Sequence, residues 1–293
     1  MKLLTLNTHS WMEDNQEAKI RELACFIREE HFDVIALQEV NQSKGEMAAT
    51  DLELERFVPA EPDIRIARDN FALVLLREIG LPYWWTWVPV HTGFVRYDEG
   101  IALLSRTPIG EAFSEYVSEM RDYENYRTRK IAGIRTLANA EESWFVSGHF
   151  GWWEDGKELF SRQWDNAQAC LDALAPAAVY VMGDFNNAAE VRGEGYDYVR
   201  SRGWTDLYEA AEEKDDGATV VKAIKGWEGN RSPLRIDLIW SSRTAAVRSC
   251  LVALNGVRGG VVSDHFGVMA DIYQSASGLN SPAQCHTDSI NRR

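Results

Sequence analysis

The amino-acid sequence predicts an α/β fold of four layers, in which two packed, mostly antiparallel β-sheets are flanked by helices. Segments with the pattern of strands outnumber those with the pattern of helices, and the helices interrupt two similar halves of the chain. Several strand segments are continuous apolar runs, which is typical of strands covered on both faces. Because no change in composition marks a linker, we expect one domain over residues 1–274 and a polar C-terminal tail over residues 275–293.

The first part of the chain is predicted to form a strand, a helix, a second strand and a second helix. These elements occupy residues 2–7, 16–30, 33–40 and 63–79. Ile20, Leu23 and Ile27 recur at helical spacing in the first helix. The second helix is expected to end before a glycine and a proline, and both strands end in polar residues.

The later elements are mostly strands. Apolar segments predicted as strands cover residues 83–90, 100–106, 130–137, 143–150, 177–186, 235–242, 245–254 and 265–273. Helices are predicted over residues 157–174, 196–202 and 206–213. This order of elements is what indicates two sheets with helices outside them.

The chain of 293 residues is acidic, with 45 Asp and Glu against 31 Lys and Arg and a net charge of −14. Nucleic-acid affinity comes largely from Lys and Arg, so this charge disfavours DNA as a partner, although a local basic patch can override the average. The four cysteines lack CxxC spacing, so neither a zinc site nor a disulfide scaffold is expected. The apolar run at the N-terminus is too short for a signal peptide or a membrane span. We therefore expect a cytoplasmic protein with no membrane partner, and the sequence does not indicate an oligomeric state.

Polar side chains collect where the apolar strands begin or end. Acids, amides and imidazoles stand at Asn7, Glu39, His149, Asp184 and Asn186, at Asp237 in a later strand, and at Asp264 and His265 where the last strand starts. Buried polar groups need partners. If these strand ends lie at one rim of the sandwich, the groups can satisfy one another around a metal ion and a phosphate.

The ligand types indicate a hard divalent cation. Asn7 and Glu39 offer oxygen ligands, and Asp264 is a further candidate. The set contains no thiolate, which favours Mg²⁺ over zinc, with Mn²⁺ as a substitute. Taken alone, Asn7 is more simply a turn former and Glu39 a helix cap or a rim ion pair. The hypothesis depends on their occurring together.

The other polar residues suit metal-assisted attack of water on phosphorus. His149 and His265 can donate hydrogen bonds to phosphate oxygens. Asp184 can hold or deprotonate a water, and Asn186 can aim its amide at the same centre. The plainer explanations are a hydrogen-bonded core histidine for His149 and a turn for the GDFN segment. Whether Asp184 or His265 is the base stays open.

Seven stretches of the chain together resemble the endonuclease/exonuclease/phosphatase family, the DNase I-like superfamily. They are LTLNTH, DVIALQEV, GIALLSRTPI, GHF, VMGDFNN, RIDLIW and SDHFGV, in family order from residue 3 to about residue 270. The resemblance implies the four-layer fold and a metal-dependent phosphohydrolase. It also implies Asn7 and Glu39 as metal ligands, Asp264 on the metal side, and Asp237 as the partner that fixes the tautomer of His265.

The same resemblance implies roles for the residues around the phosphate. His149 would contact the phosphate and protonate or polarise it. Asp184 would orient the attacking water, and Asn186 would bind phosphate. One departure is Gly148, where many relatives carry a hydroxyl residue. We expect either the loss of a minor hydrogen bond or extra space for substrate there.

The substrate must be inferred from the pocket, because the superfamily acts on DNA, lipid, and sugar or inositol phosphates. The charge disfavours DNA, and no extended apolar hairpin for entering a membrane is evident. Trp152 and Trp153 directly follow the GHF motif, and aromatic faces beside acids suit a sugar ring. The alternative is that both cap the core. Of Arg127, Arg129 and Lys130, we expect Arg129 to contact the substrate phosphate and the other two to be solvated.

Three further stretches, residues 1–20, GWWEDG and FSRQWDNA, resemble a bacterial subgroup of this family that includes a maltose 6′-phosphate phosphatase. The resemblance implies hydrolysis of a phosphorylated disaccharide to sugar and inorganic phosphate, in the cytoplasm after phosphorylating uptake. Two alternatives stay open. One is a metal-dependent phosphodiesterase or endonuclease that acts on nucleic acid, and the other is a catalytically silent binding protein. The number of metal ions also stays open.

Overall fold

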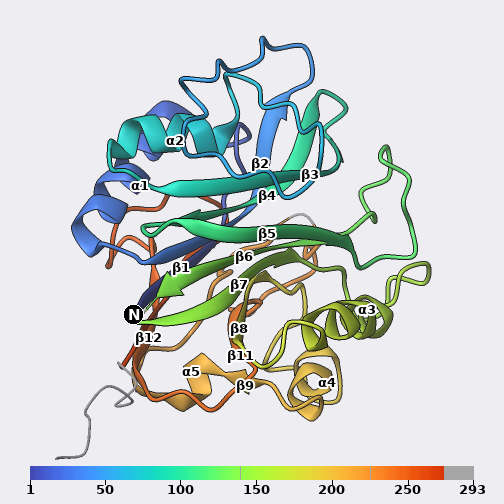
Figure 1. Cartoon of the computed structure of the whole chain (residues 1–293). Helices are drawn as coiled ribbons and strands as arrows, with labels where there is room; N and C mark the ends of the chain where they lie inside the picture. The colour runs from blue at the N-terminus through green and yellow to red at the C-terminus, as the bar shows by residue number, and fades with distance from the viewer. Residues whose placement is uncertain (139, 225, 274–293) are drawn as a thin grey trace, which may run out of the picture.

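The computed structural model describes residues 1–138, 140–224 and 226–273, and its elements form four layers (Figure 1). Two β-sheets pack face to face in the middle. Two helices, α1 (Gln16–Glu30) and α2 (Phe71–Ile79), cover one sheet, and α3 (Phe160–Asp172) and α4 (Gly195–Ser201) cover the other. The predicted four-layer α/β sandwich is confirmed. The predicted tail, residues 275–293, lies outside the described residues.

Each sheet has a mixed strand order. The first contains, from edge to edge, β10 (Ala211–Lys214), β12 (Val247–Ala253), β13 (Gly267–Ile272), β1 (Lys2–Asn7), β2 (Val34–Ser43), β4 (Tyr97–Ser105) and β3 (Trp84–Gly93). The second contains β5 (Ile109–Tyr116), β6 (Lys130–Ala138), β7 (Glu141–His149), β8 (Ala178–Asp184), β11 (Asp237–Ser241) and β9 (Thr205–Asp206). The pairs β1–β2, β7–β8 and β10–β12 are parallel, and the other pairs among these strands are antiparallel.

Apolar side chains fill the three spaces between the layers. Along β1 the alternation of a strand sends Leu3 toward the second sheet and Leu4 and Leu6 toward α1. Phe145 and its neighbours fill the space between the sheets, and Trp164 of α3 packs on the outer face of the second sheet. Burial on both faces explains why the central strands are continuous apolar runs.

Helix α2 is shorter than the sequence predicted. It begins at Phe71 rather than residue 63, because the Asn70 side chain caps it there. Asn70 Oδ1 accepts hydrogen bonds from the backbone N–H of Ala72 (3.1 Å) and Leu73 (3.3 Å). The prediction of helix over residues 63–70 is wrong.

Two further elements differ from the prediction in the second half of the fold. The helix expected over residues 206–213 is only α5 (Leu207–Ala210), because Ala211–Lys214 instead pairs with β12. Strand β5 was not predicted. It is an edge strand with two exposed glutamates, Glu111 and Glu115, so it lacks the apolar run that revealed the central strands. No helix among the described residues is long and apolar enough to cross a membrane.

Gly183 and Gly148 face each other on β8 and β7, where the backbones come close. A Cβ at position 183 would lie 1.9 Å from the carbonyl oxygen of Gly148, and the φ of Gly183 is 152°. We expect Gly183→Ala to lower the free energy of unfolding by about 2 kcal/mol or more, since no rotamer change relieves a backbone clash. Chemical denaturation measures the change.

Gly45→Ala is the matched control, because a Cβ at that position meets no atom within 4 Å. We expect it to change the free energy of unfolding by less than about 0.5 kcal/mol. Equal losses in the two variants would contradict the close approach of β7 and β8.

Candidate active site

The topology brings the ends of six strands to one edge of the sandwich. The parallel pairs β1–β2 and β7–β8 end there, and β11 and β13 begin there because they run antiparallel to β8 and β1. In register, Asp184 pairs with His149 on one side and with Asp237 on the other. Asn7, from the first sheet, reaches Asp184 of the second, and the side-chain nitrogen Nδ2 lies 3.1 Å from Asp184 Oδ2.

A β-bulge in β2 turns Glu39 toward this edge. Leu37 and Val40 both pack on the helix side of the first sheet, so the strand has one residue more between them than a regular strand would have. Gln38 and Glu39 form this bulge. Glu39 has a φ of 50°, which is uncommon for a residue with a Cβ. Gln38 Nε2 donates to Ser147 Oγ of the other sheet at 3.0 Å, and the Glu39 carboxylate is left facing the site.

One pocket of about 350 Å³ opens at this edge. Eight of the predicted site residues line it: Glu39, Arg129, His149, Trp152, Asp184, Asn186, Asp264 and His265. Asn7 and Asp237 are buried and hydrogen-bond to lining residues. The structure therefore brings together every predicted site residue except Trp153.

Asp184 is the residue on which the other groups converge. Its Oδ2 accepts the Asn7 hydrogen bond and lies 3.5 Å from His149 Nε2 and 3.8 Å from His265 Nε2. Its Oδ1 accepts a hydrogen bond from the backbone N–H of Asn186 at 2.8 Å. Burial raises the pKa of the Asp184 carboxyl to about 7, although the charge of His265 acts against this rise. An acid with this pKa can exchange a proton with water near neutral pH.

His265 is held by the buried carboxylate of Asp237. The ring nitrogen Nδ1 lies 2.9 Å from Asp237 Oδ2. Burial acts to lower the pKa of His265, but the carboxylates of Asp237 and Asp184 outweigh it and raise that pKa to about 10. The imidazole is therefore a cation at neutral pH, with Nε2–H as its second donor.

Arg129 and His149 give the pocket a buried cation and a neutral imidazole. Arg129 is only 4% exposed, and no ion pair to its guanidinium occurs among the described residues. Burial lowers the pKa of Arg129, while the carboxylates of Glu99 and Asp184 act in the opposite direction. Burial, and then the charge of Arg129, holds the pKa of His149 well below its ordinary value. The guanidinium is thus free to meet an anion in the pocket.

The two basic residues near Arg129 both form ion pairs, and the expectation that both are solvated is wrong for Lys130, which is buried. Arg127 Nε lies 2.6 Å from Asp155 Oδ2, which links the loops before β6 and after β7. Lys130 is largely buried, and its Nζ lies 2.6 Å from Glu61 Oε1. Both charges are used in ion pairs away from the pocket lining.

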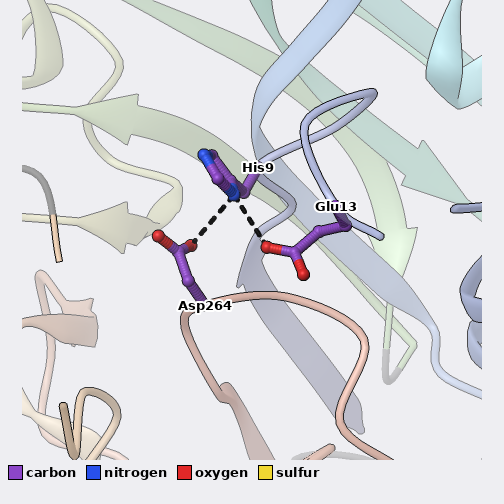
Figure 2. A group of neighbouring side chains, drawn as sticks. All are labelled: His9, Glu13 and Asp264. Atoms are coloured by element: carbon purple, nitrogen blue, oxygen red, sulfur yellow. Dashed lines mark hydrogen bonds and ion pairs between the residues drawn. The ribbon is translucent and has the colours of Figure 1, made fainter. Parts of the chain in front are cut away.

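A histidine and two carboxylates form a separate group at the rim of the pocket (Figure 2). His9 Nδ1 lies 2.7 Å from Glu13 Oε1 and 3.7 Å from Asp264 Oδ1. Glu13 also pairs with Lys19. Groups of this composition can hold a metal ion. Asp264 therefore lies at the pocket as predicted, but its contact is with His9, which the sequence analysis did not single out.

The donor atoms at the pocket fit a hard divalent cation. Among the described residues, five carboxylates, from Glu39, Glu99, Asp184, Glu228 and Asp264, line the pocket together with the guanidinium of Arg129. This excess of negative charge in a partly enclosed site favours a bound cation. Carboxylate and amide oxygens suit Mg²⁺ or Mn²⁺. Of the predicted ligands, Glu39 and Asp264 line the pocket and Asn7 is hydrogen-bonded to Glu39.

The two tryptophans after β7 have different positions. Trp152 lines the pocket, where its ring packs on Gly226 so closely that a Cβ there would lie 2.3 Å from Trp152 Cζ2. Trp153 does not line it. Its ring centroid lies 6.4 Å from that of Phe160 and 5.8 Å from that of Tyr198, on the outer face of the second sheet. The prediction that Trp153 binds substrate is wrong, because the residue belongs to the core layer under α3 and α4.

The position before His149 does not admit substrate. A Cβ on Gly148 would lie 2.6 Å from Cε2 of Phe150, so the Phe150 ring occupies the space that the missing side chain leaves. The expectation of extra room there is wrong.

Several loop residues that line the pocket were missed. Phe94 and Tyr126 line it from loops without a recognisable motif, and Trp227 contacts Asn186 from residues 219–234. His91, near the end of β3, also lines the pocket. Nothing in the spacing of these residues marks them in the sequence, because their position depends on tertiary structure.

Comparison with known proteins identifies the family. A sequence model of the endonuclease/exonuclease/phosphatase family matches residues 11–265. The chain belongs to this family. Its members are hydrolases that act on phosphoric esters and generally depend on a divalent metal ion.

Solved structures agree with this assignment. The endonuclease/exonuclease/phosphatase family protein from Leptotrichia buccalis C-1013-b is 33% identical, with a TM-score of 0.81 and coverage of 93% of this chain and 99% of that one. A mannosyl-6-phosphatase from Bacteroides thetaiotaomicron VPI-5482 is 15% identical, with a TM-score of 0.62 and coverage of 93% and 99%. A truncated Caenorhabditis elegans TDP2 is also 15% identical, with a TM-score of 0.59 and coverage of 93% and 96%. The last two are similar in fold alone. A search of curated proteins found no match.

The Asp237–His265 pair predicts how the imidazole titrates in the metal-free protein. We expect His265 to stay protonated at mildly alkaline pH in the wild type. In Asp237→Asn its pKa should fall, because the largest favourable charge is removed while burial remains. Titration of the ring signals by NMR measures this shift, and the signals of the exposed His31 serve as the internal control. An unchanged titration of His265 would show that Asp237 does not set its charge.

Proposed function

We propose that this family member is a divalent-metal-dependent phosphomonoesterase that hydrolyses a phosphorylated sugar, with maltose 6′-phosphate or a similar phosphorylated disaccharide as substrate. The observation that carries the proposal is that groups suited to a phosphate and aromatic side chains line the same pocket. Its volume of about 350 Å³ is that of a small-molecule site. The substrate class implies action in the cytoplasm, after phosphorylating uptake.

The phosphate-binding part of the proposal rests on charge and geometry. Arg129 supplies a buried cation without an ion pair among the described residues, and His265 supplies a protonated imidazole held by Asp237. Both would donate hydrogen bonds to phosphate oxygens. A Mg²⁺ ion, or Mn²⁺ in its place, would supply Lewis-acid polarisation of the phosphoryl group when bound by Asn7, Glu39 and Asp264.

The proton-transfer part assigns Asp184 to the attacking water. Its raised pKa and its contacts with Asn7 and Asn186 suit a carboxylate that orients a water and takes its proton. The water oxygen forms a bond to phosphorus as the bond from phosphorus to the sugar oxygen breaks. The sugar oxygen takes up the proton that Asp184 removed from the water, and the sugar leaves with a free hydroxyl.

The sugar-binding part rests on the aromatic side chains. Trp152, Phe94 and Tyr126 line the pocket together with polar groups such as Thr92 and Glu228. A sugar ring offers apolar faces and a rim of hydroxyls, which match such a mixture. A mannosyl-6-phosphatase of the same fold supports the class of substrate, although its likeness to this chain is one of fold.

A nucleic-acid phosphodiesterase is the weaker candidate. The fold of TDP2 is similar, but the net charge of −14 and the acidic pocket lining would repel a polyanion. We therefore propose a small phosphorylated sugar, and neither a nucleic acid nor a membrane, as the partner.

Phosphate release from maltose 6′-phosphate tests the proposal directly. We expect turnover in Mg²⁺ or Mn²⁺, loss of turnover in EDTA, and little nicking of plasmid DNA under the same conditions. Asp184→Asn should lower kcat by about a hundredfold, the usual scale for a general acid–base group. Activity that is indifferent to chelation would contradict the metal, and faster turnover of plasmid than of sugar phosphates would reverse the choice of substrate.

Trp152→Ala tests whether the pocket aromatics bind the sugar. We expect the KM for the disaccharide phosphate to rise by about fivefold, because one aromatic contact contributes about 1 kcal/mol. The KM for a small phosphate ester without a sugar should change much less. Trp153→Phe is the control, since that ring packs away from the pocket. Equal effects of Trp152→Ala on both substrates would exclude a sugar contact for this residue.

A further inference from the structure

The side chain of Asn186 is fixed by partners that allow only one orientation of its amide. Its Oδ1 lies 3.1 Å from Trp227 Nε1, and an indole N–H can only donate. Its Nδ2 lies 3.1 Å from the carbonyl oxygen of Phe150, which can only accept. The two contacts agree, so the oxygen faces Trp227 and the nitrogen faces Phe150. The backbone of Asn186, with a φ of 48°, is held by Asp184 as well.

This orientation determines the tautomer of His149. The amide nitrogen also lies 3.2 Å from His149 Nε2. An amide nitrogen can only donate, so this hydrogen bond requires the lone pair on Nε2 and the ring proton on Nδ1. Asp184 Oδ2 lies 3.5 Å from the same Nε2, which is longer than an ordinary N–H···O hydrogen bond. Both amide hydrogens of Asn186 are then engaged within the protein. Asn186 has no donor left for phosphate, which favours a positioning role over the predicted phosphate contact.

Trp227 is itself held in place by packing. It lies half-buried against the small apolar cluster of Ala188, Val220, Ile224, Leu234 and Ile236. Its backbone N–H donates to the carbonyl of Ile224 at 2.9 Å, and its own carbonyl accepts from Asn230 at 3.0 Å. The indole is therefore placed by its surroundings, and its single donor is aimed at Asn186.

We propose that Trp227 is a positioning residue, which acts through Asn186 to hold His149 as the tautomer with its proton on Nδ1. His149 Nδ1 has no hydrogen-bond partner among the described residues, and His149 lines the pocket. The chain of hydrogen bonds from Trp227 through Asn186 to His149, called the relay below, leaves this N–H as a donor for a substrate oxygen. Without the indole donor, the Asn186 amide is free to rotate, and its oxygen would then favour a proton on Nε2. The tautomer of His149 can be tested without any activity, and only the expected effect of Trp227 on turnover rests on the proposed phosphatase function.

Nitrogen-15 NMR of the ring of His149 tests the relay without any substrate. We expect the wild type to show the Nδ1–H tautomer, and Trp227→Phe to show a mixture or the Nε2–H tautomer. The kcat/KM for phosphate release should fall by about tenfold or more in the same variant, as misplaced catalytic groups do. Trp153→Phe is the matched control and should change neither, because that indole packs against Phe160 and Tyr198.

A second substitution separates the hydrogen bond from packing. Benzothienylalanine at position 227 keeps the shape of the indole but replaces the N–H with sulfur, and it should shift the tautomer as Trp227→Phe does. An Nε2–H tautomer in the wild type, or an unchanged tautomer in both variants, would overturn the inference. A wild type with the expected tautomer that releases no phosphate from sugar phosphates would instead contradict the proposed function and leave the relay intact.

Discussion

The hydrogen bond that the Asn7 amide donates to Asp184 joins the two sheets at the edge where the site lies, and the same amide also donates to Glu39 of its own sheet. Each sheet alone offers only part of the chemistry, because Asn7, Glu39 and His265 come from the first and His149, Asp184 and Asp237 from the second. The parallel pairs in each sheet end at this edge, and the antiparallel partners begin there. Face-to-face packing of the sheets then buries these carboxylates, amides and imidazoles, and many of them have one another as partners.

The electrostatic balance of the pocket follows from this arrangement. Burial works against the charges of Asp184, Arg129 and His265, and nearby groups of opposite charge act against this effect. Asp237 and Asp184 keep His265 protonated, whereas His149, beside the buried cation Arg129, is neutral. In the part of the pocket that the structure describes, carboxylates still outnumber cations. A divalent ion would neutralise the excess of carboxylates, and a phosphate would pair with the guanidinium of Arg129. The two ligands together therefore balance the charges of the pocket better than either ligand alone.

The fold and most of the site were predictable because they depend on local pattern. Continuous apolar runs ending in Asn7, Glu39 and Asp184 indicated buried central strands and the residues at their ends, and helix α1 has the bounds that its spacing predicted. Edge strand β5 and the start of α2 were missed, since one lacks an apolar run and the other depends on the Asn70 cap.

Within the site, Trp153 shows what the sequence could not predict. Adjacent tryptophans look alike in sequence, and only the packing of α3 and α4 decides that Trp152 faces the pocket and Trp153 does not. The positions of His9 and Trp227 depend on the conformation of loops, which the spacing of residues in the sequence does not predict.

The central claim is that groups from both sheets hold one divalent ion beside one phosphoryl group. Anomalous diffraction from crystals grown with Mn²⁺ and inorganic phosphate tests it most directly. The account predicts a manganese peak with Glu39 and Asn7 among its ligands, and a phosphate between that ion and the side chains of Arg129 and His265. A pocket without manganese, or a phosphate bound away from Arg129 and His265, would contradict it.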